Sequence, residues 1–266
     1  MTLSICAFEP ATGSLGVATT TGYFAVGVDV PWIHPGVGAV ATQGLTEPGY
    51  GPTVLELLRT GRPAREALTF ALNNDGHADA RQVAVVGTTA GTAAHTGQSC
   101  IPYAAHAVAG GVAVVGNLLS DAEAIEVALG AYHRAKGPLA SRLLAGLEAG
   151  DRAGGDLRGV RSAALIVRRS DAPRPIVDVR IDDDDDPLKS LRRLVIRSTA
   201  YDHLGRGINA MFEGRRADAR LETAAAHGLL PDDEQIKFWF LRAHNRPVTL
   251  SPRWKELDQR LRPGDV

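Results

Sequence analysis

Cysteine, net charge and long apolar runs are all scarce in this sequence, and each scarcity excludes a class of protein. Only two cysteines, Cys6 and Cys100, stand in 266 residues, which is too few for a disulfide framework. A formal net charge of -1 excludes the basic surface that nucleic-acid or membrane-surface binding requires. No apolar run approaches the roughly 18 residues that span a bilayer, and the N-terminus lacks the cationic segment of a signal peptide. We therefore expect a soluble, cytoplasmic protein with reduced cysteines and no nucleic-acid or membrane partner.

Motifs for metals and nucleotides are missing as well. The eight histidines are dispersed, with no spacing typical of zinc ligands such as HExxH. Glycine is abundant, yet neither GxGxxG nor GxxxxGK[ST] occurs. Five consecutive aspartates, Asp182–Asp186, are interpreted as a solvated strand end, because adjacent side chains on a strand point to opposite faces and rarely converge on one ion. We expect no metal site and no cofactor.

Strand-like and helix-like segments follow one another in groups. The expected strands are Thr2–Phe8, Ser14–Thr21, Phe24–Val30, Gly38–Thr42, Gln82–Val86, Thr92–His95, Val112–Val115, Ser162–Val167 and Ile176–Ile181. The expected helices of this part are Pro52–Arg59, Pro63–Leu72, Asp121–Ala135 and Pro138–Ala149. The strands cluster between helix pairs instead of alternating with single helices. This order predicts an α+β sandwich of mainly antiparallel sheets covered by helices, not a Rossmann domain.

The pattern becomes wholly helical after about residue 195. We place a domain boundary there, between a first domain of residues 1–195 and a helical appendage of residues 196–266. The helices expected around and beyond the boundary are Pro187–Tyr201, Ile208–His227, Asp232–His244 and Arg253–Leu261.

Thr2 is the first candidate for chemistry. Its small side chain favours removal of Met1, which would expose a free threonine at the start of a strand. A threonine hydroxyl is a weak nucleophile without a base beside it, and a free α-amine with a pKa of about 7.7–8.0 supplies one. If Met1 is retained, that amine is locked in a peptide bond and the mechanism fails.

The hairpin formed by Thr2–Phe8 and Leu15–Thr20 resembles the opening of proteasome-type N-terminal-nucleophile (Ntn) hydrolases. Residues 2 to about 195 are similar to a bacterial and archaeal domain-of-unknown-function family assigned to the Ntn-hydrolase superfamily. The stretches that carry the similarity are Ala25–Gly27, Gly36–Gln43, Tyr50–Pro52, Arg81–Val83, Thr96-Gly97 with Cys100, Gly116–Leu119, Gly137–Ala140, Ala153–Asp156, and Arg158-Gly159 with Ser162–Leu165. The resemblance implies a four-layer αββα sandwich over residues 1–195.

Several site residues follow from this resemblance. Asn117 is expected either to donate to an oxyanion or to act as a turn asparagine. Asp156 and Arg158 are expected to form an ion pair that orients the N-terminal amine or binds a substrate carboxylate, or else clamps a loop. The remaining predicted substrate-binding residues are Thr20, Thr42, Gln43, Glu47, Tyr50 and His95. Two features depart from the resemblance: Thr21-Gly22 replaces a Ser-Arg pair, and the first 135 residues contain no lysine to assist the nucleophile.

The tail carries a second resemblance. Phe238–Leu241 and Ser251–Leu257 are similar to a degenerate tetratricopeptide-like appendage, of a kind also described as peptidoglycan-binding. Such repeats need about three copies for stability, so we interpret the tail as a packing or dimerisation module with its aromatic residues at a subunit or domain contact. A homodimer or larger homo-oligomer is expected.

Three functions stay open. The first is hydrolysis of an amide-like C–N bond in a small molecule through Thr2. The second is a deaminase or ring-opening hydrolase that retains Met1 and uses Glu47, Asp156 or His95 as an acid or base. The third is a non-catalytic assembly protein.

Overall fold

The computed structural model describes residues 2–261, which form two compact units. The first unit ends at Val195 and the second begins at Ile196, inside the long helix α6 (Pro187–Phe212). Within residues 2–261, every helix is too short or too polar to traverse a lipid bilayer. All the strands described below belong to the first unit.

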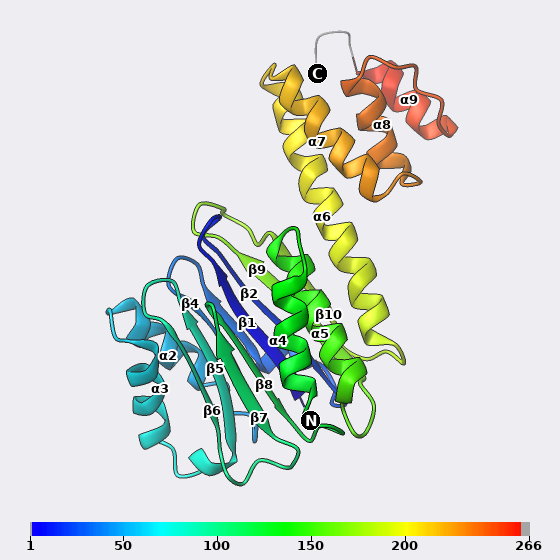
Figure 1. Cartoon of the computed structure of the whole chain (residues 1–266). Coiled ribbons are helices and arrows are strands. Elements are labelled where there is room, and N and C mark those ends of the chain that lie inside the picture. The colour runs from blue at the N-terminus through cyan, green and yellow to red at the C-terminus, as the bar shows by residue number, and fades with distance from the viewer. Residues whose placement is uncertain (1, 262–266) are drawn as a thin grey trace. The chain divides into compact units, whose positions relative to one another are not determined.

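The first unit contains two antiparallel sheets (Figure 1). The six-stranded sheet has the order β10-β9-β2-β1-β8-β7, and the four-stranded sheet has the order β3-β4-β5-β6. Strands of the larger sheet are β1 (Thr2–Glu9), β2 (Ser14–Thr21), β7 (Ala105–Ala109), β8 (Val112–Asn117), β9 (Ser162–Arg168) and β10 (Val177–Ile181). Strands of the smaller sheet are β3 (Pro31–His34), β4 (Gly38–Gly44), β5 (Arg81–Gly87) and β6 (Thr92–Thr96). The antiparallel pairing predicted from the clustered strands is confirmed.

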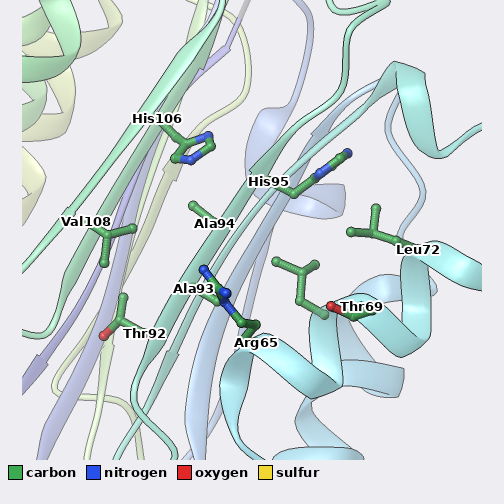
Figure 2. Close-up of a pocket in the computed structure, with 10 residues that line it drawn as sticks. Arg65, Thr69, Leu72, Thr92, Ala93, Ala94, His95, His106 and Val108 are labelled. Atoms are coloured by element: carbon green, nitrogen blue, oxygen red, sulfur yellow. The ribbon is translucent and has the colours of Figure 1, made fainter.

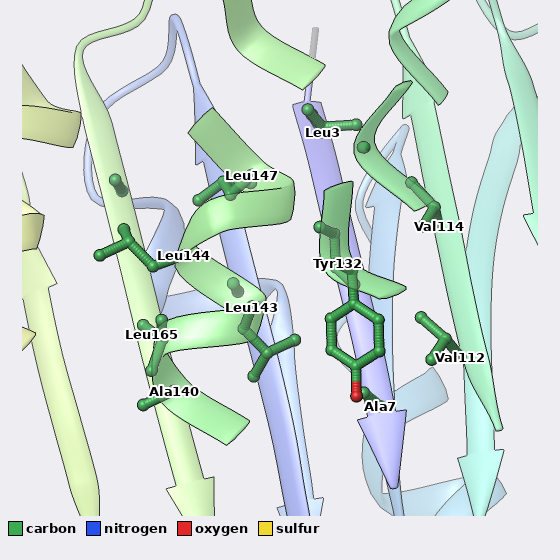
Figure 3. Packing of buried hydrophobic residues seen from close by; sticks show 14 of the residues in the cluster. Leu3, Ala7, Val112, Val114, Tyr132, Ala140, Leu143, Leu144, Leu147 and Leu165 are labelled. Atoms are coloured by element: carbon green, nitrogen blue, oxygen red, sulfur yellow. The ribbon is translucent and has the colours of Figure 1, made fainter. Parts of the chain in front are cut away.

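Three apolar layers hold these elements together. Helices α4 (Ala124–Arg134) and α5 (Leu139–Gly154) cover the six-stranded sheet, and their leucines pack on Leu3 and Leu165 (Figure 3). Helices α2 (Tyr50–Arg59) and α3 (Ala64–Asn73) cover the four-stranded sheet. A third cluster lies between the two sheets. Because strand side chains alternate, interior strands such as β1 and β4 contribute to two of these layers.

Strand β1 shows how this alternation positions the candidate site. Leu3, Ile5 and Ala7 belong to the cluster under α4 and α5, whereas Cys6 belongs to the cluster between the sheets. Side chains two residues apart lie on one face of a strand. Thr2 therefore faces the same side as Cys6, toward the four-stranded sheet.

Residues 24–30 were expected as a strand, and this prediction is wrong. The segment instead contains the short helix α1 (Val26–Asp29), preceded by Ala25 with φ 54°. The backbone N–H of Val26 donates to Ser162 Oγ at 3.0 Å, so a side chain replaces the strand partner. Val26 and Val30 are still buried in the apolar cluster between the two sheets, although the segment is not a strand.

The second unit corrects one further expectation. A single helix over Ile208–His227 is wrong, because α6 ends at Phe212, Gly214 adopts φ +73°, and α7 (Arg216–Leu229) begins anew. Helices α8 (Glu234–Ala243) and α9 (Pro252–Arg260) complete the unit. Phe238 is fully buried within the chain, with its ring 5.2 Å from those of Trp239 and Trp254. No subunit contact is needed to cover it.

The aspartate run lies at the surface between β10 and α6. Arg161 pairs with Asp183 and Asp185, and the carboxylate of Asp186 accepts the backbone N–H of Lys189 in the first turn of α6. These contacts agree with a solvated segment whose carboxylates favour the N-terminus of a helix.

Candidate active site

A cavity of about 550 Å³ lies where β1 begins and where β2, β4 and β8 end. Its lining includes the first residue of β1, Thr2, and the last residues of the other three strands, Thr21, Gly44 and Asn117. Helix α1, a short 3-10 helix and loops contribute the rest of the wall. Strand ends from both sheets therefore meet at one hollow.

Three polar side chains form a row across the floor of this cavity. In the sheet register, Thr2 pairs with Thr21 on β2 and with Asn117 on β8. Directly paired residues of antiparallel strands have their side chains on the same face, about 5 Å apart at Cβ. Thr2 Oγ1 donates a hydrogen bond of 3.3 Å to Thr21 Oγ1. Two hydroxyls and an amide thus face the cavity side by side.

Two glutamines of the four-stranded sheet hydrogen-bond to Thr2 and Asn117 of this row. Gln43 of β4 and Gln82 of β5 are paired in register and fully buried, and Gln43 Nε2 donates to Gln82 Oε1 at 2.7 Å. Gln43 Nε2 also donates to the carbonyl of Thr2 at 2.8 Å, and Asn117 Nδ2 donates to Gln82 Oε1 at 2.9 Å. Both the backbone of Thr2 and the side chain of Asn117 are therefore oriented by the amide pair.

The amide pair extends into a larger buried network. Ser4 Oγ donates to Gln43 Oε1 at 2.6 Å and lies 2.7 Å from Thr19 Oγ1. Gln82 Nε2 donates to the carbonyl of Gly116 at 2.8 Å and to that of Ala105 at 3.1 Å. Buried polar groups of this kind are costly unless they are paired, and paired networks rigidify their surroundings.

Sequence reasoning missed Gln82, Ser4 and Thr21 as parts of the site. The available signal was an amide or hydroxyl within a strand whose other residues are small and apolar, as in Arg81–Gly87. A polar side chain in such a strand must find a buried partner, but the partner's identity depends on how the two sheets face each other.

Asp156 and Arg158 form an ion pair beside the cavity. The Asp156 side chain is completely buried and accepts from Arg158 Nε at 3.1 Å, from the Arg158 backbone N–H at 2.9 Å and from the Gly22 backbone N–H at 2.5 Å. Burial opposes ionisation of Asp156, but the hydrogen bonds from Arg158 and Gly22 outweigh it and hold its pKa below the ordinary value. Arg158 lines the cavity, so the buried carboxylate fixes part of its wall.

Two predicted substrate-binding threonines face away from the cavity. Thr20 pairs with Leu3, which belongs to the helix-side core, and its hydroxyl donates to the carbonyl of Ser162 at 3.0 Å. Thr42 is buried, and its hydroxyl donates to the carbonyl of Glu47 at 3.1 Å. Both residues satisfy backbone groups, because strand alternation turns them from the side that Thr2 faces.

Glu47 and Tyr50 line a different hollow, of about 310 Å³, together with Asp75. The Tyr50 hydroxyl donates to Asp75 Oδ2 at 3.0 Å, and burial and the neighbouring carboxylate raise the pKa of Tyr50 well above its ordinary value. Glu47 is exposed and accepts the backbone N–H of Gly49 at 3.0 Å.

His95 lies in a third hollow, of about 540 Å³, between α3 and the edge strands β6 and β7. Figure 2 shows the rings of His95 and His106 and the guanidinium of Arg65 around this space. His95 Nε2 is 3.1 Å from the carbonyl of Ala78. Burial and the nearby His95 lower the pKa of His106. Of the predicted site residues, only Thr2, Asn117 and Arg158 line the first hollow. Glu47 and Tyr50 line the second and His95 lines the third. The others, Thr20, Thr42, Gln43 and Asp156, line none of these three hollows.

The described part of the chain, residues 2–261, contains no cluster of three or more His, Cys, Asp or Glu side chains suited to hold a metal ion. Cys100 lines the Thr2 cavity, but its Sγ donates to the carbonyl of Arg81 at 3.4 Å and burial raises its pKa. A buried thiol of raised pKa is a poor nucleophile.

Comparison with known proteins assigns this architecture. Residues 2–191 match a family of unknown function, DUF1028. The chain belongs to the DUF1028 family. Protein SPO2555 from Silicibacter pomeroyi, a crystal structure described by the same DUF1028 family, superposes with a TM-score of 0.70 at 32% sequence identity. The match covers 74% of this chain and 86% of that chain. No curated protein matches at a significant level.

Proposed function

We propose that this DUF1028 protein is an Ntn hydrolase that cleaves an amide-like C–N bond of a small molecule, with Thr2 as the nucleophile after removal of Met1. The observation that carries the proposal is the position of Thr2. It opens an interior strand of the larger sheet and faces a cavity of about 550 Å³, in a row with Thr21 and Asn117. Because Thr2 is the first residue of a rigid strand, its hydroxyl is held in a fixed position toward a substrate in the cavity.

The reaction would use the free α-amine of Thr2 as its base. The amine takes the hydroxyl proton, directly or through a water, while Oγ1 attacks the substrate carbonyl carbon. The tetrahedral intermediate collapses as the C–N bond breaks and the leaving nitrogen takes the proton back. Water then attacks the Thr2 ester and releases the acid. Before the attack, the hydroxyl of Thr2 donates to Thr21 Oγ1, and Gln43 Nε2 donates to the carbonyl of Thr2 and holds its backbone in place.

Asn117 would stabilise the oxyanion. One N–H of its amide donates to Gln82, and an amide NH₂ carries two donors, so the second is left to serve the cavity that Asn117 lines. Loss of one oxyanion donor typically costs about 3–4 kcal/mol of transition-state stabilisation. Asp156 acts as a positioning residue, since its buried carboxylate holds Arg158 and Gly22.

The arrangement of layers supports an αββα assignment of the Ntn type. One helix pair packs on each outer face, and the two sheets face each other across an apolar cluster. The alternative that uses acid–base residues with Met1 retained is less favoured. His95 and Glu47 lie in other hollows, and the lowered pKa of Asp156 makes it a weak base. Oligomerisation through a tetratricopeptide-like tail remains a separate hypothesis.

The test begins with intact mass and N-terminal sequencing of the purified protein, where a chain starting at Thr2 is expected. The protein is then treated with p-nitrophenyl acetate and mapped by peptide mass spectrometry. We expect rapid acetylation of Thr2, on Oγ1 or on the α-amine after migration of the acetyl group, retained in Thr2→Ser and at least about tenfold slower in Thr2→Ala, which leaves only the amine to react. Thr46→Ala, at another threonine lining the cavity, is the matched control and should be acetylated at the wild-type rate. A chain starting at Met1, or an unchanged rate of acetylation in Thr2→Ala, would refute the mechanism.

A further inference from the structure

Large apolar side chains surround the mouth of the Thr2 cavity. Tyr23, Phe24, Leu45 and Ile101 all line it, and their exposed fractions are 72%, 66%, 54% and 59%. Single exposed apolar residues are common at protein surfaces, but four around one cavity are not explained by folding. We call these four residues the apolar rim.

The backbone that carries Tyr23 and Phe24 is fixed by buried groups. The N–H of Gly22 donates to the buried Asp156 carboxylate, and the N–H of Tyr23 donates to Thr21 Oγ1 at 3.3 Å. Ser162, which is fully buried, donates its hydroxyl to the carbonyl of Tyr23 at 2.7 Å. The fold thus holds this turn firmly while leaving both rings in solvent.

The other two rim residues are held in the same manner. The N–H of Leu45 donates to the carbonyl of Ala80 at 2.9 Å, and the carbonyl of Leu45 accepts from the guanidinium of Arg81. The carbonyl of Ile101 accepts the N–H of Leu118 at 2.7 Å. Three separate loops therefore present apolar side chains from fixed backbones, and such preorganisation lowers the entropy cost of binding a ligand.

The charge of the cavity points to a neutral ligand. Among its described lining residues, the charged side chains are Asp29 and Arg158, one of each sign, and Arg158 is paired with the buried Asp156. Apart from the α-amine of Thr2, which the proposed mechanism uses in its neutral form as the base, no excess of cations lines the cavity for a phosphate or a polycarboxylate. The polar row of Thr2, Thr21 and Asn117 lies at one end, and the apolar rim lies at the mouth.

We propose that the cavity binds a neutral amide bearing an aromatic or branched aliphatic group, with that group against the apolar rim and the amide at Thr2. The volume of about 550 Å³ lies within the range of small-molecule sites, which combine mostly apolar walls with a few polar groups. This inference rests on the proposed function, because the amide is placed by the Thr2 row, but the rim contacts are tested by binding alone.

Binding of 4-phenylbutyramide and of butyramide, measured by ligand-observed NMR titration, compares amides that differ only by a phenyl group. We expect butyramide to bind at least about tenfold more weakly, because it has no phenyl group to remove from water against the apolar rim. Phe24→Ser and Ile101→Ser should each weaken binding of 4-phenylbutyramide by about threefold or more. Phe212→Ser is the matched control, since Phe212 is a similarly exposed aromatic residue that does not line the cavity, and should bind like wild type.

The inference fails if the two amides bind equally, or if the rim variants bind 4-phenylbutyramide as wild type does. Conversion of a dimer to a monomer by Phe24→Ser and Ile101→Ser, seen by sedimentation without any change in amide binding, would instead make the rim a contact between copies. Normal binding without rapid acetylation of Thr2 would overturn the proposed hydrolase while supporting this binding site.

Discussion

Gln82 offers the sharpest test of the network that supports the candidate site. Its carbonyl oxygen accepts from Gln43 and Asn117, and its two N–H groups serve three acceptors within hydrogen-bond distance, two of them the carbonyls of Gly116 and Ala105. Gln82→Leu keeps the approximate volume of the side chain and removes all of these hydrogen bonds. The substitution therefore separates polar pairing from packing.

The expected loss of opening free energy follows from the hydrogen-bonding groups that Gln82→Leu leaves without a partner. A net hydrogen bond is worth about 1 kcal/mol, and a buried group left unsatisfied costs about 1–3 kcal/mol. Gln43 keeps its bond to the Thr2 carbonyl and Asn117 borders the cavity, so both are partly compensated, and the leucine regains some apolar burial. We expect Gln82→Leu to lower the opening free energy of the surrounding sheet by about 3 kcal/mol.

Hydrogen exchange of the β5 and β8 amides measures this opening free energy. A loss of about 3 kcal/mol corresponds to roughly a hundredfold faster exchange. Gln98→Leu, at an exposed glutamine, is the matched control and should change the opening free energy by less than about 0.5 kcal/mol. The double variant Gln43→Leu/Gln82→Leu should cost less than the sum of the single changes by about 1–2 kcal/mol, since the amides are paired. Equal, small effects of Gln82→Leu and Gln98→Leu would refute the argument.

Two further predictions concern the helices around the smaller sheet. Gly51→Ala should destabilise the protein by about 1–3 kcal/mol in urea unfolding, because the new Cβ would lie 2.2 Å from Trp32 Cγ, whereas Gly228→Ala, with open space at its Cβ, should be neutral or stabilising. A hydrogen bond from Arg81 holds the pKa of Asp75 well below its ordinary range despite burial. The Asp75 contribution to stability is therefore present above the unfolded pKa of about 3.9 and lost as pH falls below it. The melting temperature of wild type should fall more steeply than that of Asp75→Asn between pH 5 and pH 2, and parallel curves would contradict this.

Local residue patterns predicted most of the secondary structure because the relevant forces act over short stretches. Alternating apolar residues located β1, β2, β5 and β8, and proline at a first turn located α2 and α3. The short strands β3 and β7 were not predicted. The helix break at Gly214 had a local signal, because a glycine in the left-handed region often ends a helix. The prediction of one helix over Ile208–His227 used apolar spacing alone and missed this signal.

In residues 24–30, tertiary contacts override the structure that the local sequence pattern predicts. The segment is apolar throughout and suits a strand, yet Ser162, more than 130 residues away, captures the N–H of Val26. A side-chain partner that distant leaves no trace in the local pattern. The same reasoning applies to Thr20 and Thr42, whose outward-facing positions follow from the register of β2 and β4.

The sequence by itself determined that strands cluster between helix pairs, that Thr2 begins the first strand, and that Asn117 lies near the end of a strand. It also placed Asp156 and Arg158 in or beside a glycine-rich turn. These are properties of short stretches, decided by side-chain periodicity and turn chemistry. Only the tertiary structure decided which of them meet. The sheet register brought Thr21 and Asn117 beside Thr2, the facing of two sheets placed Gln43 and Gln82 beneath them, and three loops from distant segments assembled the apolar rim. The reason is physical: register and sheet packing are set by burying many small apolar side chains at once, a sum over long-range contacts that no single segment carries.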